Sequence, residues 1–440
     1  MNKINLSKQY EKVDSPLVFN LLRKVEIIKA NEGCVKIHND TKHYWESIAK
    51  HNEAQAIRSF FDDESQVLIS TAIINETIQR IKSSPEFQVN FQLYRKNGRI
   101  NMKNGVFNVY TKKLEDYRET DYFTYVVNVK YTTNCNIRSC HSFLKFVQTS
   151  LETDVGDTKL QQLLEILAYL ISDLEGAKLA FFFIGKGNSG KSVLLNLLRF
   201  VIGDEFCSTI AFNKLGSEFD TALLHGKRVN ICSEVSCAKV SSPDIFKQVV
   251  SHDIISANRK NKAQITFRVE TKLITAGNVL PRFNNIDGTD AVANRMLVVK
   301  FNKSIPKNEW IPDLDKKLMD EADKIFSSAV NTLADLERRN FVFTENKESF
   351  ECIDQYKKSQ NSLDEFVNDS CIIDQNSKIH KSKLWEAYRK YCMDNCYEIL
   401  IDQMMFNDKI ISLQGVSPSK FRLQGPPLAG YIGISLKEIV

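Results

Sequence analysis

A glycine-rich segment carries the clearest chemistry in this sequence. It follows the pattern G-x-x-x-x-G-K-[ST] and consists of Gly185, Lys186, Gly187, Asn188, Ser189, Gly190, Lys191 and Ser192. In such a loop the glycines let backbone N–H groups converge on phosphate oxygens where side chains would collide. Lys191 then reaches the β- and γ-phosphates, and Ser192 offers a hydroxyl to Mg²⁺. The segment therefore predicts binding of a nucleoside triphosphate.

Glu234 and Asn278, which lie further along the chain, have side chains that would complete a hydrolytic site. Glu234 ends a short apolar strand over residues 228–234. A carboxylate there can hold Mg²⁺ through water or polarise the attacking water, although an ordinary surface glutamate is the alternative. Asn278 follows a predicted strand over residues 271–276, where its amide could bond both the γ-phosphate and the lytic water. A plain turn residue is the alternative interpretation of Asn278.

Arg295 precedes the apolar run at residues 296–299. A segment in this place could project toward the nucleotide of a neighbouring subunit, where an arginine stabilises the charge of phosphoryl transfer. An ion pair within its own subunit is the alternative.

A basic turn separates two further predicted strands, over residues 254–257 and 264–269, and contains Arg259, Lys260 and Lys262. Inside a ring, such a turn would present cations to a phosphodiester backbone in a contact that weakens with salt. A solvated charged turn is the simpler alternative.

These residues need a scaffold that holds strand ends and helix starts together. The apolar run 181–184 predicts a buried strand directly before the glycine-rich loop, and the spacing of leucines in 193–200 predicts a helix after it. From residue 177 to 301 strand-like runs alternate with helical ones, which indicates an α/β nucleotide-binding domain. Upstream, Asn-Gly turns predict a small sheet within 91–130, and residues 141–172 return to helical periodicity.

Bulk composition is that of a folded, multidomain protein. The chain has 440 residues, 43% hydrophobic and 26% charged, with a net charge of +5 that is compatible with a polyanionic partner without establishing one. Ten cysteines lack the spacing of a disulfide scaffold, and neither a signal peptide nor an apolar run of membrane length is evident. We expect a reducing, cytoplasmic setting.

The order of these motifs resembles that of superfamily 3 helicases of the phage and plasmid DNA primase-helicase type, whose relatives include poxvirus replication proteins. Four segments carry the resemblance: GKGNSGKS at 185–192, NICSEVS at 230–236, FKQVVSHDIISANRK at 246–260 and TAGNVLPRFNNIDGTDAVANRMLVVKF at 275–301. Similarity extends upstream through INMKNGVFNVYTKKLEDY and LQQLLEILAYLISD.

The resemblance implies an AAA+-like ATPase that uses ATP and Mg²⁺, assembles into a ring that is usually a hexamer, and pulls one DNA strand through a central channel. It gives Lys191 and Ser192 the roles of the P-loop pair and Glu234 that of the Walker B acid. Lys260 would be the channel lysine, Asn278 the sensor and Arg295 the arginine finger. The implied partners are single-stranded and forked DNA, with a separate primase or other replication proteins, and no membrane.

The expected domain organisation follows from the motifs and the resemblance together. Residues 1–90 are expected to be mostly helical, and residues 91–172 to form a small sheet and a helical collar. The ATPase domain is expected at 173–340, a linker at 341–361 and a winged-helix-like domain at 362–440. The expected class is thus α/β, with an N-terminal α+β region.

Two departures from the family pattern limit what is carried over. Glu234 is the only acid of its motif, and Asn294 stands where relatives often have a second arginine. Residues 1–90 are also too short a stretch for a primase domain, so we expect no primer synthesis by this chain. A replicative helicase is the first hypothesis, and an initiator or loader that uses ATP as an assembly switch is the second. A remodelling ATPase acting on protein is the third.

Overall fold

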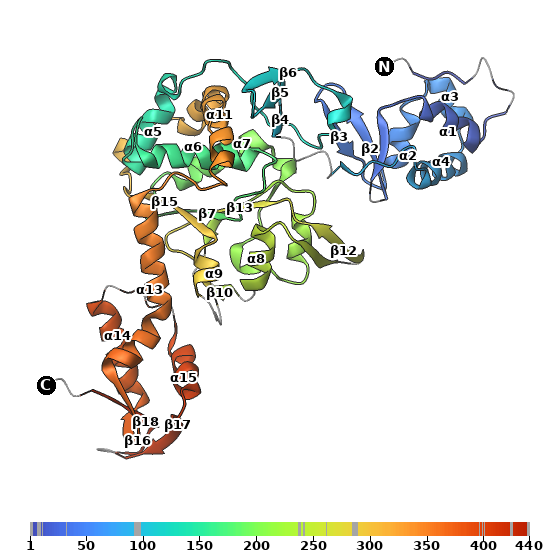
Figure 1. The fold of residues 1–440 in the computed structure, drawn as a ribbon. Coiled ribbons are helices and arrows are strands. Elements are labelled where there is room, and N and C mark those ends of the chain that lie inside the picture. The colour runs from blue at the N-terminus through green and yellow to red at the C-terminus, as the bar shows by residue number, and fades with distance from the viewer. Residues whose placement is uncertain are drawn as a thin grey trace.

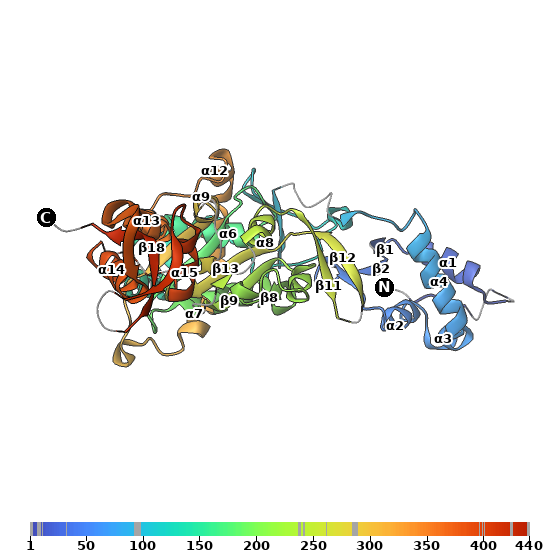
Figure 2. The ribbon, with the colours of Figure 1, turned by 90° about the horizontal axis from the view of Figure 1, so that it is seen from below.

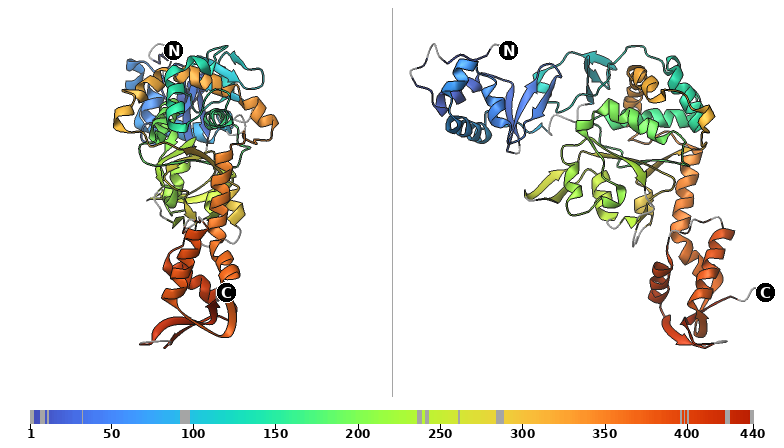
Figure 3. Two further views of the ribbon diagram at one scale, coloured as in Figure 1. Left: turned by 90° about the vertical axis from the view of Figure 1, so that its left-hand side faces the viewer. Right: turned by 180° about the vertical axis from the view of Figure 1, so that it is seen from behind.

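The computed structural model describes residues 3–6, 10, 12–31, 33–91, 98–235, 239–240, 243–260, 262–283, 289–395, 397, 399, 401–422 and 426–437. Three bodies follow one another along the chain, and a long helix joins the second to the third (Figure 1). Together they form an L, with the central body at the corner (Figure 3).

The N-terminal body packs four helices against a three-stranded antiparallel sheet. Its elements are α1 (Ser15–Arg23), β1 (Ile28–Asn31), β2 (Cys34–Asn39), β3 (Tyr44–Ser47), α2 (Glu53–Arg58), α3 (Asp63–Leu68) and α4 (Thr71–Ser83), with strand order β1-β2-β3. The expectation of a mostly helical region is therefore incomplete. Because these strands are only four to six residues long and β2 alternates poorly between buried and exposed positions, they leave a weak periodic signal.

The region expected at 91–172 contains a small antiparallel sheet and two helices. The sheet comprises β4 (Arg99–Met102), β5 (Gly105–Asn108) and β6 (Lys113–Glu115), and the Asn104-Gly105 turn joins its first two strands. The helices are α5 (His141–Leu151) and α6 (Thr158–Ile171), and their interpretation as a collar stays a prediction. Twelve of the fourteen residues of α6 are buried, since it packs against both the central sheet and later helices.

The central body is built on a five-stranded parallel sheet of order β15-β7-β13-β9-β8. Its strands are β7 (Ala180–Gly185), β8 (Cys207–Ser208), β9 (Val229–Val235), β13 (Lys272–Gly277) and β15 (Met296–Phe301), with helices α7 (Lys191–Ile202), α8 (Pro243–Val250) and α9 (Thr289–Ala293). Phe181 and Phe183 enter the core on one face of β7, and Phe182 and Ile184 enter a second core on the other. Burial on both faces explains why β7 is apolar without alternation.

Smaller elements complete the central body. A hairpin of β11 (Ile254–Arg259) and β12 (Lys262–Arg268) projects from it on the side away from the long helix (Figures 1 and 2). Strands β10 (Lys239–Val240) and β14 (Arg282–Phe283) form a short parallel pair. Three helices, α10 (Leu314–Asp320), α11 (Ala322–Val330) and α12 (Leu333–Arg338), return to pack against α6 and α7.

The long helix α13 (Lys347–Ser370) occupies much of the segment expected to be a linker at 341–361. Asn346 caps it by accepting hydrogen bonds from the backbone of Glu348 and Ser349, at 2.8 and 3.3 Å. Buried Tyr356 attaches it to the central body by donating to the carbonyl of Pro281 at 3.0 Å. Residues 347–361 therefore belong to the helix that joins the central and C-terminal bodies, a regular element where the sequence predicts only a linker.

The C-terminal body surrounds its own core of aromatic and aliphatic side chains. After α13 come β16 (Cys371–His380), α14 (Lys381–Asp394), α15 (Gln403–Ser412), β17 (Ser417–Phe421) and β18 (Leu428–Leu436), with antiparallel sheet order β16-β18-β17. Across the described part of the chain, no helix combines the length and the apolar character needed to cross a bilayer.

Candidate nucleotide site

The glycine-rich loop joins the buried strand β7 to the start of α7, as the sequence predicts. Gly190 has φ +90°, and a Cβ at this position would lie 2.6 Å from the ring of Phe146 and 2.8 Å from Ser150 Oγ. At the other end of the loop, a Cβ on Gly185 would lie 2.3 Å from the carbonyl oxygen of Phe301. Both glycines are therefore required by close packing, and the loop between them passes over the N-terminus of α7.

Lys191 lies under this loop with its ammonium group held by the loop itself. It donates to the carbonyls of Gly185 and Lys186 at 2.6 and 2.7 Å, and to Ser189 Oγ at 3.1 Å. Burial lowers the pKa of the Lys191 ammonium. A cation gathered by backbone carbonyls at a helix N-terminus can exchange these partners for phosphate oxygens, so the residues present fit a polyphosphate.

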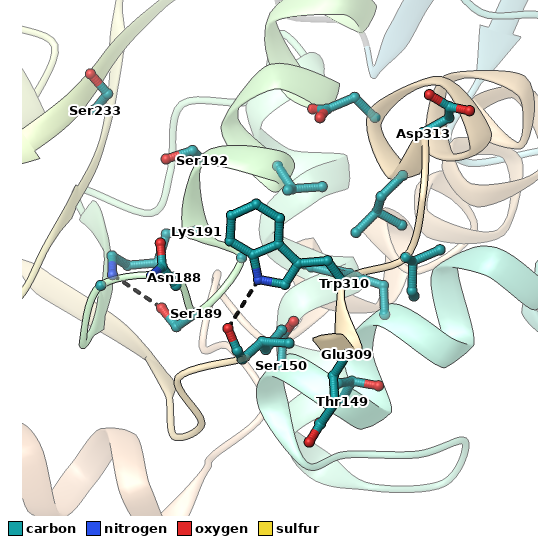
Figure 4. A pocket seen from close by; sticks show the side chains of 18 of the residues that line it. Thr149, Ser150, Asn188, Ser189, Lys191, Ser192, Ser233, Glu309, Trp310 and Asp313 are labelled. Atoms are coloured by element: carbon teal, nitrogen blue, oxygen red, sulfur yellow. Dashed lines mark hydrogen bonds between the residues drawn. The ribbon is translucent and has the colours of Figure 1, made fainter. Parts of the chain in front are cut away.

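A cavity of ≈ 960 Å³ opens above the loop (Figure 4). The carboxyl ends of neighbouring strands form part of its lining: Ser233 of β9, and Gly277 with Asn278 at the end of β13. Because β13 lies between β7 and β9 in the sheet, Asn278 is placed beside the phosphate loop. The structure thus brings Asn278, Lys191 and Ser192 to one cavity, at the edge where ligands of parallel sheets bind.

Glu234 is placed by its backbone alone. It belongs to β9, next to the cavity-lining Ser233, and its side chain lies outside the described part of the structure. Within the described residues no group of three or more His, Cys, Asp or Glu side chains could hold a metal ion. The assignment of Ser192 and Glu234 to Mg²⁺ stays a prediction.

Arg295 lies at the amino-terminal end of the parallel strands, whereas Lys191 lies beyond their carboxyl-terminal end. Its carbonyl accepts from the backbone of Ala180, the first residue of β7, at 2.8 Å. Five strand steps of about 3.3 Å separate Ala180 from Gly185, roughly 17 Å in all. The guanidinium folds back instead onto the carbonyl of Ala291 at 2.6 Å. Arg295 and Lys191 therefore do not meet within one subunit.

The basic hairpin predicted from the sequence is present. Arg259 and Lys260 are exposed at its tip, and the Arg259 Nε–H donates to the carbonyl of Ala263 at 3.3 Å. Lys262 begins the second strand, and its side chain lies outside the described residues. Among the described side chains, neither Arg259 nor Lys260 lines the cavity above the phosphate loop.

Sequence patterns did not identify the wall of the cavity that faces the phosphate loop. Helix α5 contributes Phe146, Thr149 and Ser150, and the segment after β15 contributes Ile305, Glu309 and Trp310. These residues belong to no motif. Their position follows from tertiary packing of α5 and of residues 302–316 against the loop.

Comparisons with known proteins agree with the resemblance drawn from the motifs. The family described as "D5 N terminal like" matches residues 21–151, and "Family of unknown function (DUF5906)" matches residues 183–295. The resemblance to primase-helicases is confirmed. The second match covers the last three residues of β7, the phosphate loop and the chain as far as Arg295.

One curated relative is "Putative helicase V13" of the Sputnik virophage, 28% identical over 156 residues. The aligned stretch is 33% of this chain and 20% of that protein, so the chain spans about a fifth of the relative's length.

Among solved structures, the A form apo structure of the NrS-1 C-terminal region is similar with a TM-score of 0.50 and 14% identity, over 96% of this chain and 100% of that one. A likeness at this identity concerns the fold alone, and it supports the arrangement of an α/β core with flanking bodies.

Proposed function

We propose that this chain is an ATP-dependent DNA helicase of the superfamily 3 type, acting in the replication of a phage, plasmid or other mobile element inside its host or virus-infected cell. One observation carries the proposal: the cavity in which the Lys191 loop meets the end of β9 and Asn278 after β13. Such a convergence of a cation, backbone N–H groups and an amide suits the terminal phosphates of a nucleoside triphosphate.

Lys191, Ser192, Glu234 and Asn278 each have a distinct part in this proposal. The Lys191 ammonium leaves the carbonyls of Gly185 and Lys186 and pairs with β- and γ-phosphate oxygens. Ser192 and Glu234 hold Mg²⁺, which neutralises charge on the phosphates when bound. Asn278 orients water and the γ-phosphate, as its place at the end of β13 supports.

Arg295 acts in trans in this proposal. Because it lies at the opposite end of the strands from its own Lys191, any nucleotide that it contacts would be that of a neighbouring subunit. The proposed assembly is a closed ring, for which a hexamer is the expected size, and the AAA+-like domain of each subunit is proposed at residues 173–340.

DNA contact is assigned to the projecting hairpin through Arg259, Lys260 and Lys262. The exposure of Arg259 and Lys260, and the place of Lys262 at the start of β12 beside the turn, support contact with a phosphate backbone. The C-terminal body, proposed at 362–440, has the order helix, strand, two helices and two strands, which supports a winged-helix module.

That module also favours the second candidate function, a DNA-binding initiator or loader in which ATP drives assembly without unwinding. The two functions are separated by ATP-dependent displacement of a labelled strand from a tailed duplex, with Lys191→Ala as the matched control. The helicase predicts displacement by the native protein and none by the variant. ATP-dependent assembly on DNA without displacement would favour the initiator, and equal displacement by both proteins would refute the motor.

A further inference from the structure

The segment that follows β15 is attached directly to the phosphate loop. Ser304 Oγ donates to the carbonyl of Gly187 at 2.8 Å, and the backbone N–H of Ile305 donates to the carbonyl of Asn188 at 2.9 Å. Since both bonds end on the loop that would hold phosphates, residues 305–316 form the adjoining wall of the same cavity.

Trp310 is the prominent side chain of this wall, and Figure 4 shows its indole in the cavity, opposite Lys191 and Asn188. It is 51% exposed, although it is among the largest apolar side chains of the protein. The indole N–H donates to the carbonyl of Ile305 at 3.0 Å, which fixes the ring and uses its single donor. What remains available for a ligand is the aromatic face.

The cavity is also larger than a chain of phosphates requires. Its ≈ 960 Å³ is in the range of pockets that enclose a whole cofactor. Ser150 lines it too, and its hydroxyl is fully buried with no hydrogen-bond partner among the described groups. Because Ser150 lies against Gly190 of the loop, an unused donor and acceptor is placed beside the phosphate end of the cavity.

We propose that Trp310 is the stacking platform for the nucleobase of the bound triphosphate, with a preference for purines over pyrimidines. This inference rests on the proposed nucleotide binding and assigns a site to the base, whereas the glycine-rich motif concerns only the phosphates. Because the indole has no free donor, it distinguishes bases by the area that they stack on its face. Purines present a larger aromatic face than pyrimidines and should therefore bind more tightly. Trp310 would set affinity for the base, and Lys191 affinity for the phosphates.

The size of the effect follows from measured stacking on aromatic side chains. Loss of one base–aromatic contact weakens binding by roughly 5- to 150-fold. Trp310→Ala should therefore bind ATP that much more weakly, and Trp310→Phe should retain most of the affinity. CTP should lose less than ATP in Trp310→Ala. Inorganic tripolyphosphate, which has no base, should bind the native protein and Trp310→Ala equally.

Intrinsic fluorescence gives a direct readout, since the chain has three tryptophans and Trp45 is buried in the N-terminal region. ATP should quench the native protein and the control Trp385→Phe, whereas tripolyphosphate should not. Trp310→Phe should bind ATP without that quenching. Affinities of all variants are measured by calorimetry, so that the loss of the fluorophore does not hide binding.

The outcomes separate this inference from the proposed function. Unchanged ATP affinity in Trp310→Ala, alongside loss of binding in Lys191→Ala, would overturn the base platform and leave the nucleotide site intact. Weaker tripolyphosphate binding in Trp310→Ala would also overturn it, because the indole would then support the phosphate loop. No binding of ATP or tripolyphosphate to the native protein would refute the proposed function itself.

Discussion

Asp173→Asn removes a buried negative charge that pairs with the buried guanidinium of Arg228, close to the buried side chain of Lys272. Asp173 Oδ1 accepts from Arg228 Nη1 at 2.5 Å, and its other oxygen accepts from Tyr125 at 3.0 Å. Lys272 donates to the carbonyls of Tyr169 and Ser172 at 2.5 and 2.7 Å. This cluster joins the segment before β7 to the starts of β9 and β13, the strands that end at the cavity.

The expected cost is large because the substitution leaves the buried guanidinium of Arg228 without its carboxylate. Breaking one partner of a buried ion pair typically costs about 3–5 kcal/mol. The amide that Asp173→Asn introduces keeps one oxygen that can still accept a hydrogen bond from Arg228 or Tyr125, so part of the interaction is retained. We therefore expect about 3 kcal/mol, the lower end of the range.

Amide hydrogen exchange over β9 and β13 measures this cost separately from the stability of the other bodies. A loss of about 3 kcal/mol corresponds to exchange roughly 100-fold faster in those strands. The matched control is Asp204→Ala, which breaks an exposed pair with Arg199 in the same body, and should cost under about 1 kcal/mol. Equal exchange in both variants would refute the view that the cluster holds the strands in register.

Three further predictions concern the interface, the hairpin and the response to pH. Mixing Arg295→Ala with Lys191→Ala subunits should restore some ATPase activity if the arginine acts in trans, and no recovery at any ratio would contradict this. Lys260→Ala should lower single-stranded DNA affinity and reduce the salt slope by about 1, while the exposed Lys214→Ala changes neither by a comparable amount; equal effects would remove the hairpin from the DNA path. Burial lowers the pKa of His252 to about 4, so the unfolded chain, at about 6.5, takes up its proton first as pH falls. Between pH 6.5 and 4, the free energy of unfolding of the native protein should therefore fall by up to about 3 kcal/mol more than that of His252→Asn. Urea unfolding that gives the same difference between the two proteins at both pH values would contradict this.

Local patterns were sufficient to predict the core of the site. The phosphate loop, the strand before it and the helix after it are contiguous, so the sequence from 181 to 200 specifies all three. The hairpin at 254–268 was predicted for the same reason, because a polar turn between two alternating runs is a short-range signal.

Features made by distant contacts were not predicted. Asp173 and Arg228 are 55 positions apart, and each looks like a surface charge until the sheet forms around it. Trp310 belongs to no motif, and its position in the cavity depends on residues 304 and 305 bonding to the phosphate loop. The length of helix α13 was not predicted for a similar reason. Its buried face depends on a distant contact, in which Tyr356 donates to the carbonyl of Pro281.

The central claim is that the cavity above the Lys191 loop hydrolyses ATP in response to DNA. Phosphate release by the purified full chain, measured with and without single-stranded DNA, tests it most directly. We predict hydrolysis that rises when DNA is added and is abolished in Lys191→Ala. No hydrolysis in the presence of DNA, or equal hydrolysis by Lys191→Ala, would contradict the account.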